Sequence, residues 1–125
     1  MVEDWFELFL AQNLVIDGLI YPLVYESFDA EGQKHGGAAI SMLSEFMSEW
    51  FADHSRWTDT VIKGAAAESE ANTARLADWF ATWRDNAATA LRPLSAYVLG
   101  DAGDAAVDAA VATLNARADK LGLAV

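Results

Sequence analysis

Hydrophobic residues along this chain recur at the three- and four-residue spacing of α-helices, and no segment alternates with the period of two that marks a half-buried strand. The pattern therefore predicts an all-α protein. Four helices are expected, over residues 5–28, 38–63, 72–99 and 105–121. Polar and glycine-rich segments separate them, at residues 29–37, 65–71 and 100–104.

The first predicted helix is apolar on nearly every face, which is typical of a helix buried on all sides. Asp4, followed by Glu7, has the spacing of a helix start with an acidic first turn. Pro22 lies inside the helix and predicts a kink, since proline removes one backbone donor and crowds the preceding turn.

The second and third helices each carry one apolar stripe that is expected to face the core. The second stripe comprises Leu43, Phe46, Met47, Trp50, Phe51, His54, Trp57 and Val61. The third comprises Leu76, Phe80, Trp83, Ala87, Leu91, Leu94 and Val98. The last helix offers only a thin apolar line, formed by Val107, Val111, Leu114, Ala118 and Leu121. We therefore predict that this helix packs weakly or needs a partner, and that truncation after Leu99 is tolerated.

The chain has 125 residues, enough for one compact domain and too few for two. It carries five Trp and six Phe. In so small a domain these rings either all fill the core or some of them face a partner, and we favour the second interpretation. A formal charge of −11 without any Lys/Arg cluster argues against binding to nucleic acid. The absence of Cys leaves no disulfide framework and no thiolate metal site, which suits a reducing compartment.

The amino terminus is acidic where a signal peptide would be basic. The longest uninterrupted apolar run near it, Gly18–Tyr25, falls short of the roughly 20 residues that cross a bilayer. We therefore expect a cytoplasmic protein without a membrane partner.

Helical bundles build iron sites from inward-facing Glu-x-x-His turns. The two histidines here, His35 and His54, have Gly32 and Phe51 three residues before them. One stripe histidine without such a carboxylate is most often a buried, hydrogen-bonded core residue, so no metal site is expected. Ser55 follows His54 directly and faces another direction on a helix, so the pair is no catalytic dyad and no catalytic residue is assigned.

Two carboxylates, Glu7 and Asp17, fall within the apolar first helix and should each have a partner, either Arg56 or a group on another chain. Arg56 and Trp57 have two interpretations. In the first, Trp57 fills the core and Arg56 pairs with Asp53 or Asp59. In the second, both dock a neighbouring subunit, because Arg and Trp are favoured interface anchors.

Three groups of residues carry a resemblance to a known family. They are Asp4-Trp5-x-Glu7-x-Phe9-x-x-x-Asn13-Leu14-Val15 with Phe28, then Asp53-His54-Ser55-Arg56-Trp57 with Lys63, then Leu76-x-x-Trp79-x-x-x-Trp83 with Ala87-Ala88 and Leu91-x-Pro93-Leu94. In order and spacing they resemble the carboxy-terminal part of the beta (small) hydroxylase subunit of bacterial multicomponent monooxygenases, the group that acts on methane, propane, phenol and toluene. The resemblance covers about residues 4–98.

The resemblance implies a ferritin-like helical half-bundle over residues 1–99, followed by an acidic, Ala-rich helix over residues 100–125. In this family the alpha subunit carries a di-iron centre, and the beta subunit is a degenerate copy of the same fold. Aligned with the alpha subunit, Phe6 and Phe51 stand where carboxylate ligands would, and only His54 keeps a ligand identity. The beta subunits of the family are longer and include two preceding bundle helices.

The implied role is that of a non-catalytic scaffold in a hydroxylase that uses dioxygen and NAD(P)H-derived electrons to oxygenate a hydrocarbon. No cofactor is expected in this chain, and the implied partners are the alpha subunit, possibly the gamma subunit, or a second copy. The residues expected at interfaces or in structural roles are Trp5, Glu7, Asn13, Trp50, His54, Arg56 and Trp57.

Two alternatives stay open at this point. The first is a stand-alone, self-associating helical interaction module without a redox role. The second is a small metalloprotein whose ligands come from two chains, with His54 joined by Glu7 or Glu49.

Overall fold

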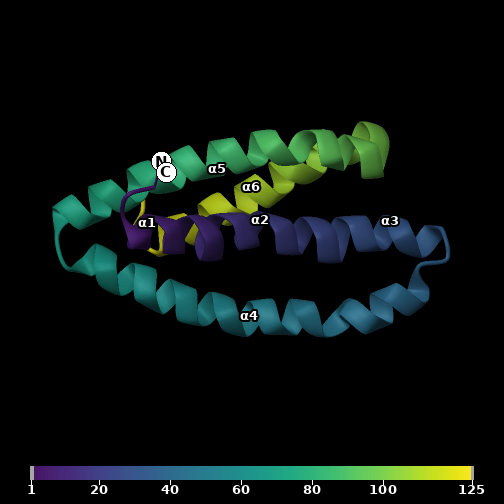
Figure 1. Ribbon diagram of the computed structural model, residues 1–125, viewed down its shortest axis with the longest axis horizontal. Helices are drawn as coiled ribbons and strands as arrows, with labels where there is room; N and C mark the ends of the chain where they lie inside the picture. The colour runs from purple at the N-terminus through teal and green to yellow at the C-terminus, as the bar shows by residue number, and fades with distance from the viewer. Residues whose placement is uncertain (1, 125) are drawn as a thin grey trace.

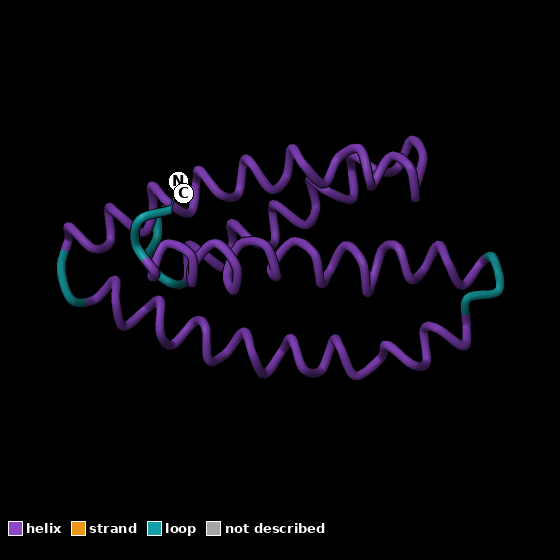
Figure 2. Tube along the Cα trace, in the orientation of Figure 1, coloured by secondary structure: helices purple, strands orange, loops and turns teal. Residues whose placement is uncertain are grey.

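The computed structural model describes residues 2–124, and every regular element within that range is helical, which confirms the all-α class there. The helices form long rods that lie side by side, joined by short connections (Figures 1 and 2). In chain order the elements are α1 (Trp5–Phe9), η1 (Leu10–Ile16), α2 (Asp17–Pro22), η2 (Leu23–Phe28), α3 (Asp29–Lys34), α4 (Ala38–Ala67), α5 (Glu70–Leu99), η3 (Gly100–Ala102) and α6 (Gly103–Lys120).

The first rod runs from α1 to α3 as one continuous helix, Trp5–Lys34. Asp4 caps its start as predicted, since its side chain accepts a hydrogen bond from the Phe6 N–H at 2.8 Å. Two segments of the rod, η1 and η2, are π-helical, a wide and rare geometry that is frequent at functional sites. Pro22 directly precedes η2 and does not end the helix.

Two predicted boundaries were wrong. Residues 29–34 are helical, because the polar side chains pair along the helix: Lys34 Nζ lies 2.8 Å from a Glu31 oxygen, and Gln33 donates to Asp29 at 2.8 Å. Gly64 does not end the second long helix, and α4 continues to Ala67.

The first rod lies between α4 and α5 in the view of Figure 1, with α6 returning beside α5. Its residues Leu10, Leu14, Val15 and Leu19 are fully buried. They form one core with side chains of the other rods, among them Ile62, Phe80 and Leu114. The prediction of a first helix buried on all sides was wrong in part, because this line of residues is buried while Leu8 is 57% exposed.

The last helix packs more firmly than its thin apolar line predicted. Leu114, Ala118, Leu121 and Leu123 belong to the main core and are at most 6% exposed. Alanine lets α6 approach its neighbours closely, so that few large side chains suffice to seal the core. The prediction of weak packing was wrong, while the division of the chain into residues 1–99 and 100–125 stays a prediction.

The predicted apolar stripe of α4 does not lie on a single buried face of the helix. The residues of α4 that are buried are Thr58, Ile62 and Ala66. Phe51 and His54 are half-buried on the adjoining side, whereas Phe46 is 62% exposed. The predicted stripe thus spans an inner and an outer face, because the amino-terminal half of α4 contacts the first rod along one side only (Figure 1).

The first rod is long and apolar enough to cross a membrane by length and composition alone, with a mean hydropathy of 1.4 over its most apolar window. Core helices of soluble proteins pass the same test. In this fold Leu10, Leu14 and Leu19 are covered by the other rods. The expectation of a chain without a membrane partner stays a prediction.

Candidate functional site

The most connected polar group in the fold lies where η1 meets α4, and Asn13 is at its centre. Asn13 Nδ2 donates to the Phe9 carbonyl at 3.0 Å, and this bond sets which way the amide points. Oδ1 therefore faces His54, whose Nε2 lies 2.9 Å away. Because an amide oxygen only accepts, His54 Nε2 carries the proton and donates it.

The His54 ring is held by packing as well as by this bond. Trp50 stacks on it with ring centroids 4.7 Å apart and planes 9° from parallel. Asp17 places Oδ2 at 3.8 Å from His54 Nε2, beyond a direct hydrogen bond but within ion-pair range when the ring is protonated. His54 is thus a fixed, partly buried histidine, as the sequence predicted for a lone stripe histidine.

Asp17 lies on α2, one turn beyond Asn13. Gln12 Nε2 donates to its Oδ1 at 3.0 Å. Burial raises the pKa of the Asp17 carboxyl above its ordinary value, outweighing the opposing effects of Gln12, His54 and Arg117. Burial and the nearby Asp17 charge raise the pKa of Tyr21 as well.

Arg117 joins α6 to this cluster and was not singled out from the sequence. Its guanidinium contacts Asp59 with N–O distances of 2.7 and 2.8 Å and donates to the Ser55 carbonyl at 3.3 Å. It also lies over the Phe51 ring, 5.9 Å from the centroid. The sequence offered only one indication of this role, namely a basic residue beside the apolar line of a helix made mostly of small residues.

The two aromatic residues at degenerate ligand positions are packed against other rings. Phe51 stacks on Tyr21 with centroids 4.7 Å apart and planes 10° from parallel. Phe6 contacts Trp5 and Phe9 at 5.2 and 5.5 Å. The structure therefore brings Phe51 next to the His54 cluster, through Tyr21 and Arg117. Phe6 is connected to His54 through the rings of Phe9 and Trp57.

Glu7 is paired within the chain, but not with Arg56 as predicted. Trp83 Nε1 on α5 donates to Glu7 Oε1 at 3.0 Å. Arg56 instead pairs with Asp53 on the same exposed face of α4, one of the two partners predicted for it. Asp59, the other, is taken by Arg117.

The predicted interface tryptophans lie at the surface. Trp5 is 74% exposed, Trp57 is 54% exposed and Trp50 is about half exposed. Trp57 nonetheless rests on Phe9, with centroids 5.3 Å apart. The interpretation of Trp57 as a core residue was therefore wrong, because α4 turns this residue outward, away from its buried line of Thr58 and Ile62.

The donor set around His54 does not fit a di-iron centre. Its ring nitrogen Nε2 is a donor to Asn13, one carboxylate lies near it, and the Tyr21 and Phe51 rings occupy the neighbouring space. Among residues 2–124, no three His, Asp or Glu side chains converge in a way that would hold a metal ion. The cluster can hold the first rod, through η1 and α2, in fixed register with α4 and α6.

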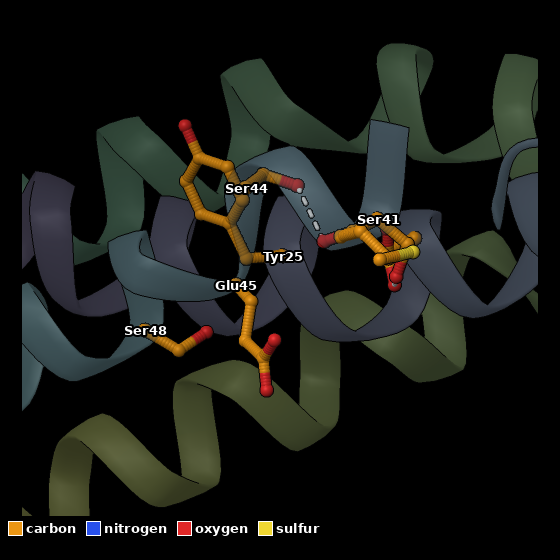
Figure 3. Close-up of a pocket in the computed structure, with 7 residues that line it drawn as sticks. Tyr25, Ser41, Ser44, Glu45 and Ser48 are labelled. Carbon is orange, nitrogen blue, oxygen red and sulfur yellow. Dashed lines mark hydrogen bonds between the residues drawn. The ribbon is translucent and has the colours of Figure 1, made fainter. Parts of the chain in front are cut away.

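A separate hollow of about 300 Å³ lies between η2, α3 and α4, away from the His54 cluster (Figure 3). Ser41 Oγ donates to Asp29 Oδ2 at 2.8 Å on its wall, and Ser44 donates to the Ser41 carbonyl at 3.4 Å. These hydroxyls are engaged by the chain itself. The hollow is open and its carboxylate Asp29 is already bonded to Ser41 and Gln33, so it is better described as a helix junction than as a ligand site.

The chain matches the family described as Methane/Phenol/Alkene Hydroxylase over residues 1–70. It is 42% identical over 123 residues to the phenol 2-monooxygenase oxygenase component DmpL of Pseudomonas sp. (strain CF600), covering 98% of this chain and 36% of that protein. It is 43% identical over 122 residues to the phenol 2-monooxygenase oxygenase component MhpL of Acinetobacter pittii (strain PHEA-2), covering 97% of this chain and 36% of that protein.

The chain thus spans about a third of the length of these relatives. No solved structure matches it. The match over residues 1–70 contains the Asn13–His54 pair and the aromatic positions Phe6 and Phe51. The chain belongs to the Methane/Phenol/Alkene Hydroxylase family.

Proposed function

We propose that this chain is a non-catalytic scaffolding part of a soluble di-iron monooxygenase that hydroxylates a phenol or a related hydrocarbon. Its helices would form a ferritin-like half-bundle, over residues 1–99, that packs against the iron-bearing alpha subunit. The two relatives named above are oxygenase components of phenol 2-monooxygenases, which supports both the assembly and the substrate class. Dioxygen, NAD(P)H-derived electrons and iron would be handled by other chains.

The observation that carries this proposal is that His54 bonds to Asn13 while Phe51, stacked on Tyr21, takes the place of a carboxylate one turn before it. With Nε2 donating to Asn13 Oδ1, only Nδ1 of the neutral His54 ring keeps a lone pair, and the Nε2 position is used to join two helices. Phe51 stands one helical turn before His54, where a Glu-x-x-His turn would place its carboxylate. The position is therefore suited to holding helices together and not to binding iron.

The proposal is tested by assembling the full chain with the alpha subunit of a phenol monooxygenase and measuring complex formation by size-exclusion chromatography and turnover of phenol. We expect a stable complex, with iron bound in proportion to the alpha subunit alone. Glu7→Gln should leave turnover nearly intact, because Glu7 accepts from Trp83 and binds no metal. Iron retained by this chain after dialysis, and lost in His54→Ala, would overturn the proposal.

A stand-alone interaction module is the second candidate, favoured by the number of exposed aromatic side chains. Under that alternative the purified chain forms a stable monomer or homodimer and has no affinity for an alpha subunit. The same chromatography experiment separates the two. A cytoplasmic location is part of our proposal, and fractionation of cells that express the chain would test it.

A further inference from the structure

Five aromatic rings form an unbroken line across α4, α2 and η2. Trp57 contacts His54 with ring centroids 5.6 Å apart, and His54 stacks on Trp50 at 4.7 Å. Trp50 in turn stacks on Tyr21 at 5.8 Å, and Tyr21 contacts Tyr25 at 5.2 Å. We call these five rings the aromatic line.

Tryptophan and tyrosine, which supply every ring of the aromatic line except His54, are the aromatic residues that lose an electron most readily. Each can release a proton as it is oxidised, from the indole N–H or the phenol O–H. Electron tunnelling weakens steeply with distance, so rings in contact exchange an electron far faster than rings separated by other side chains. Phe51, which is much harder to oxidise, stacks on Tyr21 from beside the line and does not interrupt it.

The aromatic line has a fixed middle and two accessible ends. His54 is held between the two tryptophans by its 2.9 Å bond to Asn13, so the tryptophans are bridged by a single ring. Trp57, at one end, is 54% exposed and open to an oxidant. Tyr25, at the other end, lines the open hollow shown in Figure 3, where water can take up a phenolic proton.

We propose that the aromatic line is a relay that moves an electron vacancy from the tryptophans to the tyrosine pair. An oxidant takes one electron from the indole of Trp57 or Trp50, and the indole releases its N–H proton to water. Tyr21 then gives one electron to the indolyl radical and loses its phenolic proton, while the indole nitrogen takes a proton back. The products are an intact tryptophan and a tyrosyl radical, which exchanges between Tyr21 and Tyr25 by the same reaction. The vacancy moves in this direction because a phenol that can release its proton is the easier of the two to oxidise.

This redox role goes beyond scaffolding, and only its physiological oxidant rests on the proposed function. That oxidant would be an oxidising equivalent that escapes from dioxygen activation on a neighbouring chain. The relay would carry it to a phenol beside the open hollow, where small reductants in solution could discharge it. Aromatic rings also pair for packing alone, so the test has to detect electron transfer itself.

The test is pulse radiolysis of the full chain with azide radicals, which are one-electron oxidants that attack tryptophan in preference to tyrosine. We expect the absorption of the tryptophan radical to decay while that of a tyrosyl radical rises at the same rate. This rate should not depend on protein concentration, because the transfer occurs within one chain.

Matched variants locate the path. Tyr21→Phe with Tyr25→Phe should abolish the coupled rise of the tyrosyl signal, whereas Tyr97→Phe, at an exposed position of α5, should leave it unchanged. Trp50→Phe should remove most of the rise, because the line is then interrupted next to the tyrosines. Trp79→Phe, which changes an indole outside the aromatic line, should not. Phenylalanine keeps a ring at each position, and circular dichroism verifies that each variant is folded.

The inference would be overturned by the absence of a tyrosyl rise, or by a rise whose rate scales with protein concentration. So would a coupled rise that persists in the double tyrosine variant or that Trp50→Phe leaves unchanged. Because the oxidant is supplied chemically, the outcome does not depend on a partner. A relay in a chain that forms no complex with an alpha subunit would disprove the proposed function alone, and a complex without the tyrosyl rise would disprove the relay alone.

Discussion

His54 and Asn13 are 41 positions apart in the chain, and the imidazole donates from Nε2 to the amide oxygen at 2.9 Å. This bond ties the π-helical segment η1 to α4. Asn13 also donates to the Phe9 carbonyl, so both ends of its amide are used. A residue type found at metal sites serves here as a donor between two helices.

The first prediction concerns this pair. Asn13→Leu should lower the free energy of unfolding by about 1–3 kcal/mol, because it leaves the partly buried His54 donor without an acceptor. The double variant Asn13→Leu with His54→Leu should cost less than the sum of the two single variants, since no donor is then orphaned. Urea denaturation measures all three, and strict additivity would show that the two side chains are not coupled.

The second prediction compares two aromatic residues. Phe80 is fully buried, so Phe80→Ala should cost about 3–5 kcal/mol. Trp57 is about half exposed, so Trp57→Ala should cost less than about 2 kcal/mol despite its larger ring. Urea denaturation of both variants decides the matter, and equal costs would place Trp57 in the core after all.

The third prediction reverses an expectation drawn from the sequence. Truncation after Leu99 should abolish folding, because it removes Leu114, Ala118 and Leu123 from the main core and uncovers Leu14 and Leu19. Far-ultraviolet circular dichroism and size-exclusion chromatography of residues 1–99 provide the measurement. A soluble fragment with a cooperative thermal transition would show that α6 is dispensable.

The fourth prediction concerns the close approach of α6 to α5. A Cβ atom on Gly103 would lie 2.5 Å from the Ser95 carbonyl carbon, which is backbone and cannot move aside on its own. Gly103→Ala should therefore destabilise the fold by about 1–3 kcal/mol or more. Gly64→Ala is the matched control: its Cβ meets nothing, and removing a helix-interior glycine should stabilise the chain by roughly 0.5–1 kcal/mol. Thermal melts that rank the two variants in the opposite order would contradict this.

The fifth prediction follows from the buried carboxyl of Asp17. Burial raises the pKa of this carboxyl in the folded state, so folding favours its neutral form. The stability contributed by the neutral form is fully present below the ordinary pKa of 3.8. It is lost as the pH rises from 3.8 through the raised pKa. Asp17→Asn keeps an oxygen that can accept from Gln12 and removes the buried charge. We expect it to raise the free energy of unfolding at neutral pH and to flatten the pH dependence just above pH 3.8.

Urea denaturation at several pH values tests this prediction, with Asp78→Asn, at an exposed position of α5, as the control. The control should leave the pH dependence unchanged. Loss of stability in Asp17→Asn at neutral pH would mean that the charges of His54 and Arg117 outweigh the effect of burial.

Several features were predictable from the sequence because they depend on neighbours in the chain. The helices follow from apolar spacing, the cap at Asp4 from its side chain, and the Arg56–Asp53 pair from a three-residue separation on one helix. The buried line of the last helix, with Val107 and Leu114, was also read correctly. The extension of the first rod through α3 was missed because side-chain pairs, not apolar spacing, stabilise it.

By itself, then, the sequence determined an all-α chain with one polar histidine in an apolar stripe, since helix periodicity and side-chain chemistry are local properties. Only the tertiary structure decided which part of that stripe faces inward, that Asn13 and Arg117 complete the cluster around His54, and that α6 closes the core. These depend on how helices distant in sequence approach one another, and a single apolar pattern on one helix does not specify which side its neighbours occupy.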